Sequence, residues 1–292
     1  MGDGTEASPY TRDDVLRLIK IRGGTAYGLD LSGKWFEREI DLKELDLNGI
    51  ILNKAHLLYA QLEETALFNA QLEEATLFNA QLENTILPGA HLERADLQHA
   101  NLDGAILWDV NLEGANMMGA TFSASTEMDT THWGNYILSG EQKDYNQASA
   151  TYRRLKQWYT TAGMYDVAGK FYYREMECKR KGLSWRRKFW SKLWNTIYWG
   201  LCGYGEKPER IVINASLIIF GLSLIYFAGG KLMPNSFWDC LYYSAASFTA
   251  LGYGGWVTGA TGFVRWLGVG ETFIGVFMTG LFLVTFTRKM TR

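Results

Sequence analysis

A leucine recurs every five residues through the first half of the chain. It occupies position 42 and every fifth position up to 112, and Met117 and Phe122 continue the phase. A second column lies two positions before each leucine, and between 55 and 120 it is alanine at 11 of 14 positions. Helices and strands repeat their side chains about every 3.6 and 2 residues, so neither explains a period of five. The pattern predicts a solenoid whose two columns point inward.

Two long apolar segments in the second half predict membrane-spanning helices. Residues 211–228 carry no charge, and residues 263–287 carry charges only within their first ten positions. Each segment is long enough to cross a bilayer at about 1.5 Å per residue. The short segment between them is suited to a re-entrant helix. We therefore predict spans at about 208–228 and 263–287 and a pore helix at about 236–248.

Helical patterns connect the solenoid to the first span. Apolar residues recur at helical spacing on both sides of Gly163, which predicts two connector helices. The next segment interleaves four tryptophans with basic residues, a composition that favours the membrane–water interface, and we predict an amphipathic helix there. The predicted divisions are an N-terminal cap at 1–39, the solenoid at 40–124, the connector at 125–182, the interfacial helix at 183–207 and the pore domain at 208–292.

Charge separates strongly along the chain. The net charge of −2 gives no support for a nucleic-acid partner, but residues 40–122 sum to −10 and residues 152–192 to +9. Basic residues before the first span and after the second place both termini in the cytoplasm by the positive-inside rule. The basic segment either contacts the acidic solenoid or faces anionic lipid. We favour lipid for Arg186, Arg187 and Lys188 and leave a solenoid contact open for Arg153, Arg154 and Lys156.

The sequence offers no catalytic constellation. Three cysteines lie far apart without metal-ligand spacing, so we expect free thiols at Cys178, Cys202 and Cys240. Three histidines fall at irregular outward positions of the solenoid, which favours solvated surface side chains over a metal site: His56, His91 and His99. We expect neither an enzyme nor a bound cofactor.

The solenoid resembles the pentapeptide-repeat family, whose pattern is Ala-(Asp/Asn)-Leu-x-x. The best matches are Ala95-Asp96-Leu97, Ala100-Asn101-Leu102 and Ala115-Asn116-Met117. The resemblance implies a right-handed quadrilateral β-helix with four pentapeptides in each coil. The alanine column instead holds Ile40, Leu45 and Ile50 at its start, which predicts a differently packed first coil. Some family members imitate DNA with an acidic surface and bind topoisomerase; we favour the alternative that acidic outer positions keep the stacked core soluble.

The segment after the predicted pore helix reads Thr249-Ala250-Leu251-Gly252-Tyr253-Gly254. Together with the two spans, it resembles a two-transmembrane pore-loop potassium channel. The resemblance implies a homotetramer in which these residues form the selectivity filter, and K⁺ binds the backbone carbonyls of Leu251, Gly252 and Tyr253. It also implies that Tyr242 and Tyr243 pack behind the filter, and we expect Trp256 to add support there.

Two departures from the family pattern bear on selectivity. Ala250 stands where the family has a second threonine, and Gly255 replaces the usual aspartate. Potassium permeation is therefore expected, while the strictness of selectivity is left open. Gly275 and Gly280 in the second span are candidate hinges of a gate. The alternative is that they allow close helix packing, most of which alanine would preserve.

The sequence therefore predicts a mixed fold: a cytoplasmic β-helix, a helical connector and an all-α, two-span pore-loop domain, tetrameric in the cell membrane. The function that this architecture implies is a potassium-permeable channel whose repeat domain serves regulation or assembly. Two alternatives are a less selective cation channel and a membrane-tethered interaction protein whose acidic rod binds a cytoplasmic partner. The sequence does not identify that partner.

Overall fold

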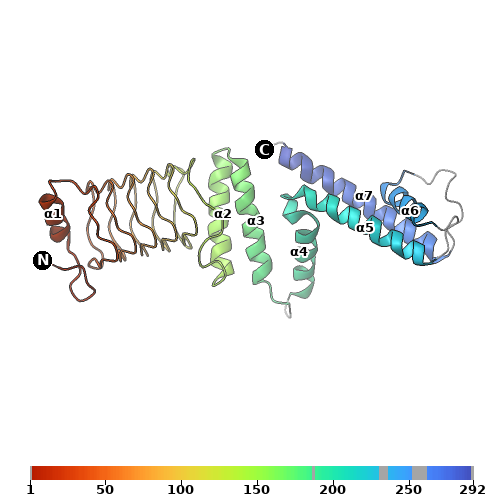
Figure 1. Cartoon of the computed structure of the whole chain (residues 1–292), viewed down its shortest axis with the longest axis horizontal. Helices are drawn as coiled ribbons and strands as arrows, with labels where there is room; N and C mark the ends of the chain where they lie inside the picture. The colour runs from red at the N-terminus through yellow and green to blue at the C-terminus, as the bar shows by residue number, and fades with distance from the viewer. Residues whose placement is uncertain (1, 186–187, 230–235, 252–261, 291–292) are drawn as a thin grey trace. The chain divides into compact units, whose positions relative to one another are not determined.

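The computed structural model describes residues 2–185, 188–229, 236–251 and 262–290. The chain divides into two compact units, Met1–Leu183 and Ser184–Arg292. In the first unit, a stack of coils lies between one helix at its start and a pair of helices at its end (Figure 1). The helices of this unit are α1 (Arg12–Ile21), α2 (Tyr145–Thr161) and α3 (Tyr165–Gly182).

Parallel bridges join the coils of the first unit. Asp41 pairs with Gln61, and Gln61 pairs with Gln81, so each coil contains four five-residue units. Backbone N–H groups donate to carbonyls of the neighbouring coils along the whole stack. The two columns fill the interior as predicted: Leu77, Ala80 and Leu82 are at most 1% exposed. Backbone hydrogen bonds and one continuous apolar core therefore stabilise the stack together.

One residue of each five-residue unit adopts the left-handed backbone region. In one such unit, the Ala75 amide donates to the Leu72 carbonyl at 3.1 Å, and Glu74 between them has a φ of +57°. This turn position holds glycine at 49, 89, 104, 114 and 119, asparagine at 69, 79 and 84, and other residues, such as Glu64 and Arg94, in the remaining units. Glycine and asparagine tolerate this conformation best, so the sequence favours the turn in those eight units.

The coils extend beyond the predicted range 40–124 at both ends. The first coil-to-coil bridge of the regular stack joins Asp30 to Ile51, and the last joins Asn111 to His132. Both pairs are 21 residues apart, whereas the pairs between them are mostly 20 apart. One extra residue near each end therefore shifts the five-residue phase, which is why the sequence pattern placed both boundaries too far inward.

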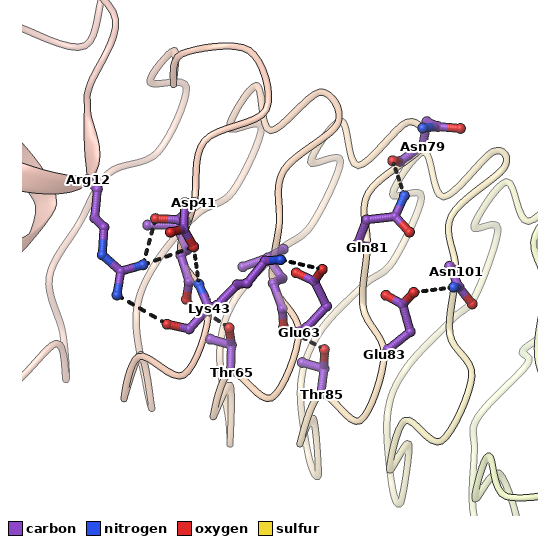
Figure 2. Close-up of polar contacts among 12 residues, drawn as sticks. Arg12, Asp41, Lys43, Glu63, Thr65, Asn79, Gln81, Glu83, Thr85 and Asn101 are labelled. Atoms are coloured by element: carbon purple, nitrogen blue, oxygen red, sulfur yellow. Dashed lines mark hydrogen bonds and ion pairs between the residues drawn. The ribbon is translucent and has the colours of Figure 1, made fainter.

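Polar side chains tie α1 and neighbouring coils together (Figure 2). Arg12 of α1 donates to the carbonyl and the carboxylate of Asp41 at 2.8 and 3.1 Å. Thr65 and Thr85 occupy the alanine column and are fully buried. Their hydroxyls donate at 2.9 and 2.8 Å to the carbonyls of Leu42 and Leu62. A threonine hydroxyl can be buried in this apolar column because its hydrogen bond to a carbonyl of the neighbouring coil offsets the cost of its burial.

Replacing one inward leucine should measure what the column contributes. Leu87→Ala is expected to lower the free energy of unfolding of residues 1–183 by about 2–5 kcal/mol, because the side chain is 1% exposed and its loss leaves a cavity. The matched control is Ile86→Ala, which removes as many carbons from a neighbouring side chain that is 41% exposed. Chemical denaturation of both variants makes the comparison, and equal losses would contradict the inward assignment.

The predicted connector belongs to the same folded unit as the solenoid. Tyr152 and Tyr159 of α2 and Phe171 of α3 are fully buried in the core cluster that contains the leucine column. Tyr159 donates to the Met128 carbonyl at 2.9 Å and accepts a hydrogen bond from Trp133 at 2.6 Å. The two helices on either side of Gly163 thus cover the last coil, a role that the sequence analysis did not assign to them.

The basic residues of α2 divide between two partners. Arg154 donates to the Ala120 carbonyl in the last coils at 2.9 Å, so it makes the solenoid contact that the sequence left open. Arg153 and Lys156 instead pair with Glu175 of α3 at 3.1 and 2.8 Å. This carboxylate is buried, and the cations around it offset the cost of its burial.

All secondary-structure elements in the described part of the second unit are helices. Its elements are α4 (Phe189–Cys202), the short 3₁₀ helix η1 (Gly203–Gly205), α5 (Pro208–Gly229), α6 (Phe237–Thr249) and α7 (Phe263–Met290). Helices α5 and α7 are long and apolar enough to cross a membrane, with mean hydropathies of 2.2 and 1.8. Helix α4 is shorter than the predicted 183–207, because Gly203, with a φ of +54°, ends it.

Candidate functional site

The short helix α6 packs against both long helices, α5 and α7 (Figure 1). Ser236 caps its start by accepting the Trp238 amide at 3.3 Å, and Ala250, with a φ of +56°, follows its end. Its 13 residues rise by about 20 Å, which is too short to cross a bilayer. An apolar helix of this length between two spans is the geometry of a re-entrant pore helix.

Tyr243 attaches the middle of α6 to both neighbours. Its ring lies edge-on to the ring of Tyr226 on α5, with centroids 5.1 Å apart. A Cβ at Gly268 of α7 would lie 2.5 Å from the Tyr243 hydroxyl, so any larger residue there would require this side chain to shift. Tyr243 is buried, whereas Tyr242, the other predicted supporting aromatic, is 47% exposed in the single chain.

Gly275 of α7 lies directly against the end of α6. A Cβ at this position would overlap the carbonyl oxygen of Phe248, a backbone atom that cannot move aside as a flexible side chain can. At Gly280, by contrast, a Cβ would have no heavy atom of the described residues outside its local helix within 4 Å. The contact favours the packing role over the hinge role for Gly275. The expectation that alanine would keep most of the packing there is therefore wrong.

A buried carboxylate joins the three helices. Glu271 of α7 is 1% exposed, and its Oε2 accepts the hydroxyl of Tyr226 on α5 at 2.8 Å. Its Oε1 makes a short hydrogen bond with the hydroxyl of Ser244 on α6. Ser244 also donates to the Ile219 carbonyl of α5 at 2.9 Å. The sequence analysis did not single out Glu271, although an acidic residue inside an apolar span is itself a signal.

The predicted filter lies only partly within the described residues. Outside them lie Gly252, Tyr253, Gly254 and Trp256. Thr249 is the last residue of α6, and its hydroxyl donates to the Ala245 carbonyl at 2.7 Å. Leu251 is 84% exposed in the single chain. The exposed residue Leu251 therefore lies two positions after the end of α6, immediately before the Gly-Tyr-Gly sequence.

Comparisons with known families match both halves of the chain. A family model described as pentapeptide repeats (8 copies) matches residues 75–107 and 95–125. A model described as ion channel matches residues 212–292, the region that contains α6, α7 and most of α5. The chain fuses pentapeptide repeats to an ion channel domain. Neither matched family is a family of enzymes.

Solved structures of pentapeptide repeat proteins are similar to parts of the chain. One from the Arabidopsis thaliana thylakoid lumen is 31% identical, covering 30% of this chain and 61% of that one, with a TM-score of 0.30. HetL from the cyanobacterium Nostoc sp. strain PCC 7120 is 28% identical, covering 38% and 54%, with a TM-score of 0.30. Rfr23 from the cyanobacterium Cyanothece 51142 is 28% identical, covering 42% and 98%, with a TM-score of 0.28.

The chain thus spans about three fifths and about half of the first two proteins. Among curated proteins, none matches it.

The end of the channel domain away from α6 is held by polar contacts between α4, α5 and α7. Arg288 near the end of α7 pairs with Glu206, just after η1, at 3.5 Å. Arg210 of α5 donates to the Trp199 carbonyl of α4 at 3.1 Å and lies over the same indole. Helix α4 is therefore attached to the start of α5 and, through the segment that follows η1, to the end of α7.

Ala250 can be tested against the backbone that the structure gives it. Its φ of +56° suits glycine and disfavours β-branched residues. We expect Ala250→Gly to be tolerated and Ala250→Thr, which restores the family's threonine, to destabilise the channel domain by about 1–3 kcal/mol. Thermal unfolding of the solubilised protein measures both. A threonine variant as stable as the glycine variant would show that Ala250 does not need this backbone conformation.

The repeats hold one group that could bind a metal ion, formed by Glu73, His91 and Glu93, whose ligand atoms lie within 4.8 Å of one another. His91 Nδ1 lies 3.0 Å from Glu93 Oε1, and Asn111 donates to the same oxygen at 2.6 Å. His91 is exposed, and Glu93 Oε1 is already in contact with both His91 and Asn111. We therefore keep the interpretation of a surface histidine.

The three cysteines are free thiols, as predicted, and all three are buried: Cys178, Cys202 and Cys240. Burial raises the pKa of the Cys178 thiol to about 12, so its reactive thiolate form is scarce at neutral pH.

Proposed function

We propose that this protein is a potassium-permeable channel of four identical chains, with two spans per chain and a regulatory or assembly domain of pentapeptide repeats. One observation carries the proposal. The short helix α6 is fastened to both spans and ends at Thr249, immediately before Ala250-Leu251-Gly252-Tyr253-Gly254. A short helix that leads into a glycine-containing loop between two spans is how a filter is held at membrane depth.

The tetramer follows from what a filter needs. One chain supplies one row of carbonyls, from Leu251, Gly252 and Tyr253, and a ring that replaces the water around K⁺ takes four such rows. The outward side of α7 is apolar: Phe273 and Phe277 are 74% and 62% exposed in the single chain. Such a surface is consistent with burial against lipid or neighbouring chains.

The repeats form the cytoplasmic part of the proposed channel. Coils of four five-residue units, bridged mostly at intervals of 20 residues, support a right-handed quadrilateral β-helix. The basic residues before α5 and after α7 favour cytoplasmic termini by the positive-inside rule. A rigid rod on that side is suited to assembling the four chains or to binding a cytoplasmic partner that regulates them.

Helix α4 is proposed to lie on anionic lipid at the inner surface of the cell membrane. Trp190 and Trp194 are 69% and 64% exposed, and Lys188 and Lys192 lie close by in the sequence. Exposed indoles beside ammonium groups are typical of the membrane interface.

Reversal potentials of the purified full chain in planar bilayers test the proposed function. With a K⁺ gradient opposed to a Na⁺ gradient, a potassium-selective pore reverses near the potassium equilibrium potential. A reversal potential near zero would favour the second candidate, a less selective cation channel, for which Ala250 and Gly255 are the specific observations. Absence of any current would contradict both and favour a membrane-tethered interaction protein.

A further inference from the structure

Glu271 stands out because a carboxylate is costly inside a membrane. It lies eight positions after Phe263 at the start of α7, a rise of about 12 Å, so it lies well inside the helix. Among the residues that the structure describes, no Lys, Arg or His pairs with it. An unpaired, fully charged carboxylate at such a place would cost several kcal/mol, so the site has to reduce that charge or neutralise it.

The oxygen atoms around Glu271 indicate how this is done. Ser244 Oγ is within hydrogen-bond distance of both the Ile219 carbonyl, at 2.9 Å, and Glu271 Oε1. A serine hydroxyl has one proton, so it cannot donate fully to both acceptors. A proton on Glu271 Oε1 resolves this conflict, since Glu271 then donates to Ser244 and Ser244 donates to Ile219. The Tyr226 hydroxyl still donates to Glu271 Oε2 at 2.8 Å.

We infer that Glu271 is a protonated positioning residue of the pore, which fixes α6 between α5 and α7 through a chain of hydrogen bonds from Tyr226 through Glu271 and Ser244 to Ile219. In this arrangement, the hydroxyl protons of Tyr226 and Ser244 and the carboxyl proton of Glu271 each have one acceptor. Ser244 lies five residues before Thr249 on the same helix, so the chain fixes the height at which the filter begins. The role in ion selectivity rests on the proposed channel function; the proton on Glu271 does not.

Two serines provide a matched test of the positioning role. Ser244 and Ser223 are both fully buried, but Ser223 on α5 donates to the Phe220 carbonyl of its own helix, at 2.6 Å. Ser244→Ala should lower the K⁺ to Na⁺ permeability ratio of the full-length channel by about threefold or more, because α6 loses a bond to each neighbour. Ser223→Ala removes the same atom and should leave the ratio unchanged. Equal ratios in the two variants would overturn the positioning role.

The permeability ratio separates positioning from folding. Loss of folded protein lowers the number of channels and the current, but it does not change the ratio measured from the channels that remain. Glu271→Gln should keep the ratio, since the amide donates to Ser244 and accepts from Tyr226 as the protonated acid does. Glu271→Leu, of similar size, should lower it as Ser244→Ala does. A glutamine variant that behaves like the leucine variant would overturn the assignment of the proton.

Infrared spectroscopy tests the proton without any ion flux. A protonated carboxylic acid has a carbonyl stretching band that an ionised carboxylate lacks. The full-length protein at neutral pH should show such a band, shifted in D₂O, which is missing in Glu271→Gln. Absence of a difference would refute the protonated state. If the unmodified protein passes no cation, the proposed function fails and the positioning of a filter fails with it, while this band still decides the protonation of Glu271.

Discussion

Gly275→Ala is expected to lower the potassium current by about tenfold or more, because overpacking a close helix contact costs about 1–3 kcal/mol or more. The added Cβ would overlap the Phe248 carbonyl oxygen, so α6 and α7 must separate or shift. Phe248 is followed by Thr249, so the displacement would reach the start of the proposed filter. The measurement is macroscopic current in bilayers, together with the thermal unfolding midpoint of the solubilised protein, which should also fall.

The control is Gly280→Ala in the same helix. No heavy atom of the described residues outside its local helix would lie within 4 Å of that Cβ, so current and unfolding midpoint should stay close to those of the parent. If the two variants behaved alike, the contact with Phe248 would not limit the pore. If only the open probability changed in Gly275→Ala, with stability intact, the hinge role would be favoured after all.

The repeat shows how far a strict period carries a prediction. The inward columns were predicted residue by residue, because a solenoid core repeats its contacts at a fixed interval. The ends were missed because one inserted residue breaks that interval. Met128 and Trp133 continue the apolar column at 0% and 4% exposure, but Met128 lies six positions after Phe122 instead of five. A search that allowed one insertion would have found them.

The channel domain shows a different limit. Its apolar spans and short helix were predicted from length and hydropathy, which are local properties of the sequence. The contacts between Glu271, Ser244 and Tyr226 join residues up to 45 positions apart, and no period or motif in the sequence predicts these contacts. For Gly275 the sequence left a hinge and close helix packing as alternatives, and it did not single out Gly268. Only the fold shows which neighbour occupies the space beside each glycine.

The boundary between the two units determines which N-terminal deletion should leave a folded channel domain. A deletion of residues 1–140 would cut inside the first unit. Tyr152, Tyr159 and Phe171 are fully buried in a core that this deletion would open. The first compact unit ends at Leu183, so a deletion of residues 1–183 removes it as a whole.

Deleting residues 1–183 is therefore expected to give a channel domain that stays soluble in detergent and retains potassium current, with an open probability different from that of the full chain. Deleting residues 1–140 should instead cause aggregation, because α2 and α3 lose the last coil that covers them. Aromatic side chains newly exposed in this way each forfeit about 1.5–3 kcal/mol of burial, which is a large share of a domain's stability. Size-exclusion chromatography and bilayer recordings compare the two.

The outcomes of this pair assign a role to the repeats. A 1–183 deletion that forms no tetramer would make the repeats an assembly domain, and one that gates like the full chain would make them dispensable for gating. A 1–140 deletion that stays monodisperse would show that α2 and α3 fold without the coils, against the shared core. In that case the hydrogen bonds from Tyr159 to Met128 and from Trp133 to Tyr159 would be contacts between independent parts rather than bonds within one unit.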